Sequence, residues 1–126
     1  MKNLLLLFCG LLVTHLCHAQ TLRMDQVPPA VHSGFKIKFP NGQQPAWSKE
    51  GTDIFEVGFI NGKKHQTALF EATGKWMETE IEINYGAAPA KVQRAFENEF
   101  EGFQSQEVFE TETPDKGLTY EIIAFK

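Results

Sequence analysis

The side chains that could do chemistry in this chain are mainly carboxylates and tryptophans. In the run WMETEIEI, which begins at Trp76, the residues Glu78, Glu80 and Glu82 alternate with mostly apolar residues. Successive side chains of an extended strand point to opposite sides of its sheet, so these carboxylates and Trp76 are expected on one face. That face must contact water, a cation or a partner, while the alternate face can pack on a core.

A metal site is one interpretation of this acidic face. Calcium ligands usually converge from a loop that carries Asp, Asn and backbone carbonyls, rather than from a row along a strand. We therefore expect a solvated face that can contact a partner, and no metal site.

The two tryptophans, Trp47 and Trp76, are candidates for such a contact. Aromatic side chains near the centre of an interface often contribute most of its binding energy. Tryptophans of small domains are also commonly packed in the core, and this alternative stays open. The candidate partner-binding residues are Trp47, Trp76, Glu78 and Glu80.

The histidines and the remaining motifs indicate no catalytic site. His32 and His65 lie outside the N-terminal apolar segment, and neither has a partner that is evident in the sequence. The chain has no nucleophile-elbow serine, no glycine-rich phosphate loop and no zinc-ligand spacing. Catalysis needs an oriented second group, so we expect both histidines to be structural, with His32 on the exposed side of a helix. No catalytic residue and no cofactor are expected.

The first nineteen residues have the layout of a secretory signal peptide. Lys2 precedes an apolar run from Leu4 to Val13, which is too short to span a bilayer as a helix. Small residues at Cys17 and Ala19 favour cleavage after Ala19, which predicts a periplasmic or secreted protein. A lipoprotein signal is the rival, but the THL that precedes Cys17 is a poor lipobox.

The part of the chain after residue 19 contains no cysteine, because both cysteines lie in the predicted signal segment. Disulfides and thiol redox chemistry are therefore excluded there. Its roughly hundred residues must form a hydrophobic core without disulfide bonds, which suits a single domain over residues 20–126. The formal net charge is −4 and no basic cluster is present, so nucleic acid is not an expected partner. No transmembrane segment is expected after signal cleavage.

Two segments predict helices of the same design. The runs VPPAVHSGFKIKFP, from Val27, and APAKVQRAFENEF, from Ala88, each place apolar residues four apart in one stripe. Each begins with proline, whose missing N–H costs nothing in the first helical turn. Pro40 ends the first helix, and Gly102 supplies the cap after the second.

After each helix the apolar period changes to two, which predicts antiparallel strands joined by short turns. Asn61-Gly62 in IFEVGFINGKK is the clearest hairpin turn. We predict an α+β fold with two helix-plus-antiparallel-strand repeats, about 25–84 and a shortened 87–126. They would form one mostly antiparallel sheet with both helices on one face. The strand Leu118–Phe125 would be a sheet edge that is open to pairing with an added strand.

The ordered segments VPPAVHSGFKIKFPN, AWSKEG, FEVGFINGKK, LFEATGKWMETE and PAKVQRAFENEF resemble those of the PepSY-like, beta-lactamase-inhibitor-like proteins of Gram-negative periplasms. The resemblance covers nearly all of the chain after residue 19. It implies helices on one side of an antiparallel sheet, a periplasmic location, a binding or inhibitory role, and no known catalytic residue. Relatives commonly carry Asp where this chain has Glu71 and Thr73, and they often continue past the strand that ends at Phe125.

Two functional hypotheses follow from these observations. The first is a secreted, non-catalytic binding module for an unknown protein partner in the envelope. Such a module could inhibit an envelope or secreted enzyme through the sheet face opposite the helices. The alternative is a small-ligand or ion-binding sensor module that uses the acidic strand face.

Overall fold

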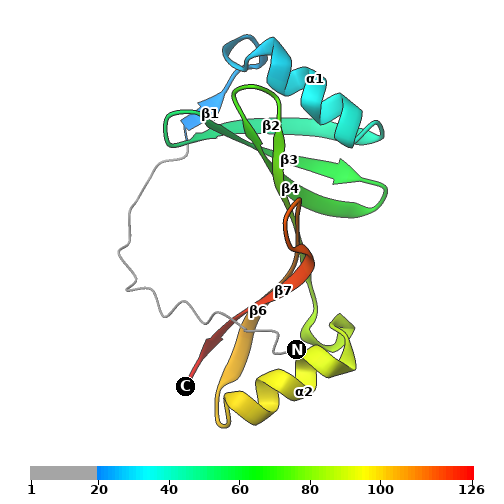
Figure 1. Ribbon diagram of the computed structural model, residues 1–126, viewed down its shortest axis with the longest axis vertical. Coiled ribbons are helices and arrows are strands. Elements are labelled where there is room, and N and C mark those ends of the chain that lie inside the picture. Colours follow the sequence, from blue (N-terminus) through cyan, green and yellow to red (C-terminus); the bar gives the residue numbers. More distant parts are fainter. Residues whose placement is uncertain (1–19) are drawn as a thin grey trace.

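The computed structural model describes residues 20–126 as a curved antiparallel sheet with two helices on one side (Figure 1). The predicted signal segment, residues 1–19, lies outside the described residues. Seven strands form the sheet in the order β1-β2-β3-β4-β5-β6-β7, so each strand pairs with its neighbours in the chain. This arrangement confirms the predicted α+β class. The elements are β1 (Gln20–Leu22), η1 (Met24–Gln26), α1 (Pro29–Lys38), β2 (Gly42–Glu50), β3 (Ile54–Asn61), β4 (Lys64–Glu71), β5 (Trp76–Ile83), η2 (Tyr85–Ala87), α2 (Ala90–Glu99), β6 (Gln104–Thr113) and β7 (Gly117–Phe125).

The main core lies between α1 and the first strands. Pro28 and Pro29 start α1, and the helix stops at Phe39 because Pro40 follows. The apolar stripe of the helix meets the inward residues of β2, β3 and β4, and aromatic rings pack edge to face there. The buried members of this cluster are Val27, Val31, Phe35, Phe39, Trp47, Phe55, Val57, Phe59, Ala68 and Phe70.

A second, smaller core lies beneath α2. Its buried hydrophobic residues are Ala88, Phe96 and Val108. Trp47 on β2 pairs with Val57 on β3, and Val108 on β6 pairs with Ile122 on β7 in the corresponding place. Four strands follow α1, whereas two follow α2 in the described residues. Each helix is thus followed by an antiparallel hairpin, β2–β3 or β6–β7, and the second half buries fewer side chains.

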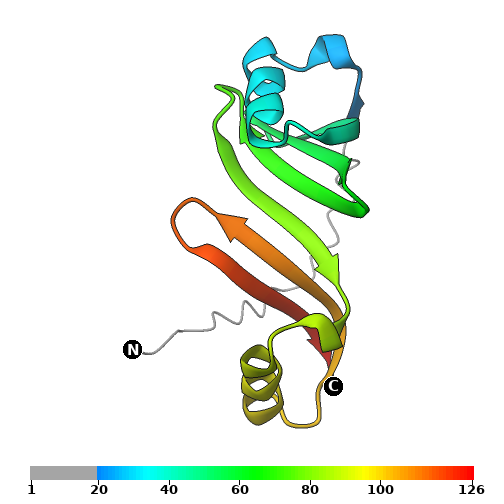
Figure 2. The same ribbon diagram turned by 90° about the vertical axis from the view of Figure 1, so that its right-hand side faces the viewer.

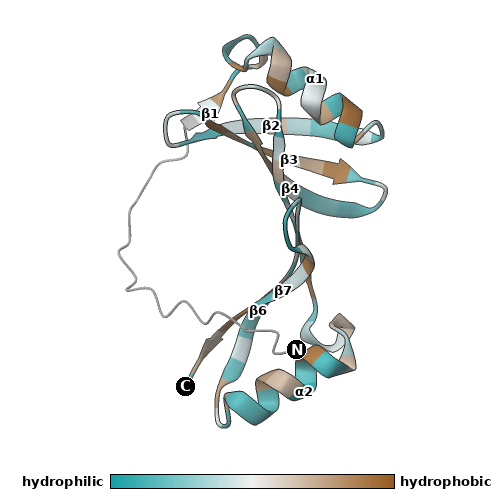
Figure 3. Cartoon of the chain, viewed as in Figure 1, coloured by the Kyte–Doolittle hydropathy of each residue, from teal (hydrophilic) through white to brown (hydrophobic). Residues whose placement is uncertain are grey.

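The sheet bends into an arc with both helices on its convex side (Figures 1 and 2). β5 runs from beneath α1 toward α2 and joins the two halves (Figure 2). Hydrophobic residues concentrate on β3 and its neighbours, whereas α2 is largely hydrophilic on the side shown in Figure 3. The concave side carries no helix among residues 20–126. In the same range, no helix combines the length and the hydrophobicity needed to cross a bilayer.

The turn between β4 and β5 supports α1 through two glycines. A Cβ atom added to Gly34 on α1 would collide with the carbonyl oxygen of Gly74 in the turn. A Cβ atom added to Gly74 would collide with the carbonyl oxygen of Ala30, and Gly74 also has a φ angle of +86°. Backbone therefore lies directly on backbone at this point, which only glycine allows.

Candidate functional site on the concave sheet face

The concave sheet face is formed by the side chains that point away from both helices. Cross-strand partners lie on the same face of a sheet, so the register identifies them. Phe55 and Val57 face α1, which places Glu56 between them on the concave side. Leu69 on β4 pairs with both Glu56 on β3 and Glu78 on β5, so all three lie on the concave face. Thr67 and Glu80, the next cross-strand pair on this face, lie there too.

Four carboxylates on this face form what we call the acidic cluster: Glu56, Glu78, Glu80 and Glu121. They come from β3, β5 and β7, and Glu56, Glu78 and Glu121 each lie close enough to Glu80 to affect its pKa. The pKa of Glu80 is raised to about 7, first by burial and then by the charges of Glu78, Glu121 and Glu56 and a hydrogen bond with Glu78. Ser48 Oγ donates a hydrogen bond to Glu56 Oε1 at 3.3 Å. The cluster therefore concentrates negative charge on an open surface and binds a proton near neutral pH.

Small residues leave a hollow in the concave face beside this cluster. Ala46 pairs with Gly58, and a Cβ atom added to Gly58 would have no neighbour within 4 Å. A hollow of about 220 Å³ lies here, lined by Gln44, Ala46, Gly58, Phe59, Ile60 and His65. A second hollow of about 500 Å³ shares His65 and reaches Glu82 and Ala87. A protruding partner side chain could enter either hollow next to the carboxylates.

Trp47, one of the candidate contact residues, does not lie on this face; the structure places it in the core, the alternative that the sequence left open. The residue is only 2% exposed and packs edge to face against Phe35 on α1, with ring centroids 5.6 Å apart. It pairs with Val57, which also faces the helix. The large apolar ring stabilises the fold more by filling the space under α1 than it would on the surface.

Trp76 is also on the helix side, in contrast to the prediction that it shares a face with Glu78 and Glu80. The register shifts between β4 and β5, so that Trp76 pairs with Phe70 while Glu78 pairs with Leu69. Met77 is the extra residue of this bulge, and it reverses the alternation at that point. Glu78 and Glu80 are the two predicted residues that the structure places on the concave face.

Polar contacts on the convex side hold Trp76 in place. Its indole N–H donates to Thr79 Oγ1 at 2.9 Å. Lys38, in the last turn of α1, lies over the Trp76 ring with Nζ 3.5 Å from the centroid. The same Nζ is 3.7 Å from Glu112 Oε1 on β6. Lys38 therefore connects the first helix to a strand of the second half.

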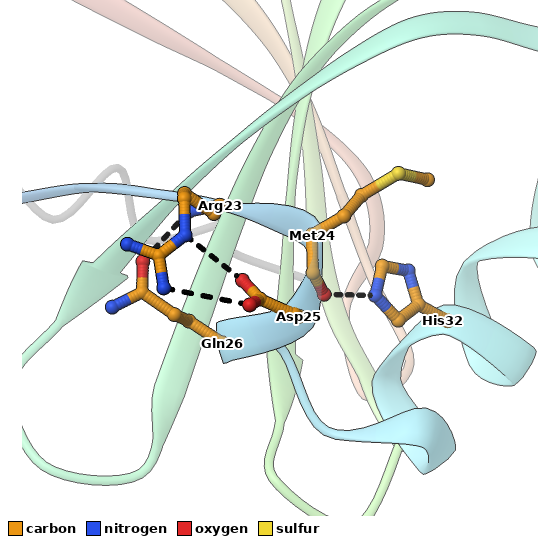
Figure 4. Close-up of polar contacts among 5 residues, drawn as sticks. All are labelled: Arg23, Met24, Asp25, Gln26 and His32. Carbon is orange, nitrogen blue, oxygen red and sulfur yellow. Dashed lines mark hydrogen bonds and ion pairs between the residues drawn. The ribbon is translucent and has the colours of Figure 1, made fainter.

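His32 is half-buried rather than on the exposed side of α1, where it was expected. Its Nε2–H donates to the Met24 carbonyl oxygen at 3.0 Å (Figure 4). Its ring centroid lies 5.3 Å from that of Trp47. Arg23 and Asp25 form an ion pair in the adjoining turn, with Nε and Oδ1 3.1 Å apart. This hydrogen bond therefore holds η1 against the start of α1. His65 lies on β4, as expected for a residue that follows the Asn61-Gly62 turn.

The acidic cluster and the hollow at Gly58 could not be recognised from the sequence. Glu56 and Glu121 stand far from Glu78 in the chain, and only the strand register brings them to the same surface. Among the residues that the structure describes, no group of three His, Cys, Asp or Glu side chains is arranged to hold a metal ion.

Comparison with known proteins gives one family and several similar folds. Residues 53–124 match the family described as "Putative beta-lactamase-inhibitor-like, PepSY-like". The crystal structure of a BLIP-like protein from Bacteroides fragilis has a TM-score of 0.70 and 20% identity, covering 77% of this chain and 70% of that one. A DUF2874 family protein from Bacteroides ovatus has a TM-score of 0.71 and 22% identity, covering 79% and 72%.

A third structure is described as a putative periplasmic protein from Bacteroides eggerthii, with a TM-score of 0.70 and 22% identity, covering 79% of this chain and 73% of that one. At these identities the likeness concerns the fold. The chain has no match among curated proteins.

Proposed function

This chain belongs to the PepSY-like, beta-lactamase-inhibitor-like family, and from that premise we propose that it is an exported module that binds a protein partner on its concave sheet face. The observation that carries the proposal is the acidic cluster on a sheet surface that no helix covers among residues 20–126. The family description and the BLIP-like neighbour support an inhibitor-like role. The predicted signal segment and the periplasmic neighbour support an envelope location.

The charge and shape of the face indicate what kind of partner it would take. Four carboxylates beside a hollow suit a convex element that carries Lys or Arg, since complementary charge speeds association and excludes acidic competitors. A basic side chain would pair with the cluster, and a neighbouring apolar side chain would enter the hollow at Gly58. In this proposal Glu78 and Glu80 are contact residues, whereas Trp47 and Trp76 support the fold from the other side.

Charge reversal on the concave face tests this proposal. The exported protein would be immobilised and exposed to an envelope extract, in parallel with a Glu78→Lys/Glu80→Lys variant. A Glu99→Lys/Glu101→Lys variant has the same net charge, but its changes lie at the exposed end of α2. We expect a partner to be retained by the parent and by the α2 variant, and lost from the concave-face variant. Equal retention by all three folded proteins would refute the proposal.

A cation-binding role is the alternative for the same face. Among the described residues no three of its side chains are arranged to enclose a metal ion, but the negative charge of its four carboxylates would attract a loosely held cation. A bound cation would relieve their repulsion and stabilise the folded state. Calcium titration followed by the melting temperature distinguishes the two functions. A rise at millimolar calcium that disappears in Glu80→Gln would support the sensor, and an unchanged melting temperature would remove it.

A further inference from the structure

Thr111, on β6, carries a buried hydroxyl group without a hydrogen-bond partner. The residue is 8% exposed, and its Oγ1 atom reaches neither solvent nor a polar atom of residues 20–126. A buried polar group without a hydrogen bond is costly, so such a group in a folded protein calls for an explanation. The other buried threonine, Thr79, accepts a hydrogen bond from the Trp76 indole N–H. Thr111 is therefore the exception among the buried threonines of this part of the chain.

The strand register places this hydroxyl on the concave face, directly beside Glu80. Thr111 pairs with Glu80 on β5, and cross-strand partners share a face. On its other side Thr111 pairs with Thr119 on β7, whose hydroxyl donates to the Thr111 carbonyl oxygen at 3.1 Å. That contact uses the backbone of Thr111 and leaves its own hydroxyl without a partner.

Glu80 and Thr111 form the closer of the two kinds of antiparallel pair. Hydrogen-bonded pairs alternate along such a ladder with pairs that lack these bonds, and the Cα atoms are about 5.5 Å apart in the first kind and about 4.5 Å in the second. Lys64 closes a two-residue turn with Asn61, so its backbone groups face β3 and those of Thr67, three residues later, face β5. Thr67 pairs with Glu80 there, which turns the backbone groups of Glu80 toward β4 and away from Thr111. The side chains of Glu80 and Thr111 therefore leave their strands close together.

Glu80 already has one hydrogen-bond partner, Glu78, which lies two residues earlier on the same face. Two carboxyl groups can share a hydrogen bond only while one of them holds a proton. Loss of the proton replaces this bond by repulsion between two carboxylates. The ionised group then needs a donor, and a hydrogen bond from a hydroxyl to a carboxylate is stronger than one between neutral groups.

We infer that Glu80 and Thr111 form a pH-sensitive switch, in which the protonated carboxyl group of Glu80 bonds to Glu78 and the ionised carboxylate turns to the Thr111 hydroxyl. Thr67, on the other side of Glu80, is the competing donor, but it belongs to the wider pair and is only half-buried. The titratable residues on this face around Glu80 are Glu56 on β3, His65 on β4, Glu78 and Glu82 on β5, and Glu121 on β7, while β6 presents Phe109, Thr111 and Thr113.

The switch sets the charge that the concave face presents. While Glu80 is protonated, the acidic cluster holds three carboxylates and one carboxylic acid, and after the proton leaves it holds four carboxylates. The change takes place in the protein alone, so it does not depend on the proposed function of this face.

NMR titration of the Glu80 carboxyl carbon tests the switch, and Glu80→Gln identifies its signal. A donor to the ionised form lowers a pKa, so Thr111→Val, which removes the hydroxyl and keeps the shape, should raise the pKa of Glu80. We expect a rise of about one unit, which is a tenfold tighter binding of the proton. Thr111→Ser keeps the hydroxyl and should titrate close to the parent protein. Thr67→Val is the matched control, and it should change the pKa of Glu80 much less.

The parent protein supplies a readout that needs no folded variant at position 111. The Thr111 Cβ signal should shift with the same midpoint as the Glu80 carboxyl, because the hydroxyl gains its partner there. A Thr111 signal that stays constant through that midpoint would overturn the inference. An unchanged or lowered pKa of Glu80 in Thr111→Val, or an equal rise in Thr67→Val, would overturn it as well.

Urea unfolding separates the switch from a purely structural role of Thr111. At about pH 5, where Glu80 is protonated and the hydroxyl is unpaired, Thr111→Val should be at least as stable as the parent. At about pH 9, where the carboxylate is ionised and has lost its donor, the same variant should be less stable than the parent. An equal loss of stability at both pH values would assign Thr111 a packing role and contradict the switch.

Discussion

Glu80 is a carboxyl group that its surroundings keep partly protonated near neutral pH. It is half-buried on β5, and both its burial and three neighbouring carboxylates favour the neutral form. The raised pKa means that the folded protein binds this proton more tightly than the unfolded chain does. Between about pH 4.5 and 7 this group therefore makes the fold less stable as pH rises, and the full cost is present above pH 7.

Glu80→Gln should therefore stabilise the protein at pH 8. The unscreened shift corresponds to about 3 kcal/mol, and solvent around a half-exposed group reduces this to about 1 kcal/mol. Urea unfolding at pH 8 and pH 4.5 would measure the gain, which should shrink at the lower pH. Glu101→Gln, at an exposed position outside the cluster, is the control and should change stability little at either pH.

Trp47 shows how a residue of the right type for recognition can have a structural role. Its ring fills the space between α1 and β3, and its buried indole N–H has no hydrogen-bond partner among the described residues. Trp47→Ala should lower the free energy of unfolding by about 3 to 5 kcal/mol, as expected for a large side chain lost from a core. Trp47→Phe should cost clearly less, because it keeps most of the packing and removes the unpaired donor. A loss below 1 kcal/mol for Trp47→Ala in chemical denaturation would contradict the buried placement.

At the scale of elements, helices and strands were largely predictable, whereas the faces of individual strands were not. The sequence predicted α1 and α2 from apolar residues four apart and from the proline at each start, and it predicted the hairpin from Asn61-Gly62. The structure confirms all three elements. The alternation rule failed at Trp76 because one extra residue, Met77, reverses the faces. Nothing in the local sequence signals that bulge, since it arises from how β5 fits against β4. Convergence of Glu56, Glu80 and Glu121 likewise depends on register and twist.

The contact between α1 and the β4–β5 turn gives a sharp prediction at this scale. Gly34→Ala would push a methyl group into the Gly74 carbonyl, so the helix must move away from the turn. We expect a loss of about 2 to 3 kcal/mol in thermal or chemical unfolding, typical of overpacking against rigid backbone. Gly58→Ala is the matched control on β3, where an added Cβ atom meets nothing, and it should be neutral or slightly stabilising. Equal effects of the two changes would argue against the close approach.

The whole molecule consists of two unequal halves that share one sheet. Ten buried hydrophobic residues belong to the cluster beneath α1, whereas Ala88, Phe96 and Val108 form the buried set in the second half. β5 and β6 carry the connection between the halves, and the Lys38–Glu112 ion pair adds a contact across it. Stability should therefore be distributed unevenly along the sheet.

Hydrogen exchange would reveal this asymmetry. In dilute protein, the amides of α2, β6 and β7 should exchange faster than those of β3 and β4, because fewer buried contacts oppose local opening there. Exchange at one common rate across all strands would show instead that the sheet opens as a single cooperative unit.

The strand order of the sheet also bears on how the chain reaches its destination. Every strand lies beside the strand that precedes it in the sequence, so no strand must wait for a distant, later segment before it can pair. If the chain is exported as we propose, folding would advance from the N-terminal end as the polypeptide emerges from an export channel, with the α1 core complete while α2 is still in transit. Local pairing of this kind shortens the loops that must close and speeds folding. A translocating chain would thereby acquire its most stable part first, which opposes backsliding into the channel.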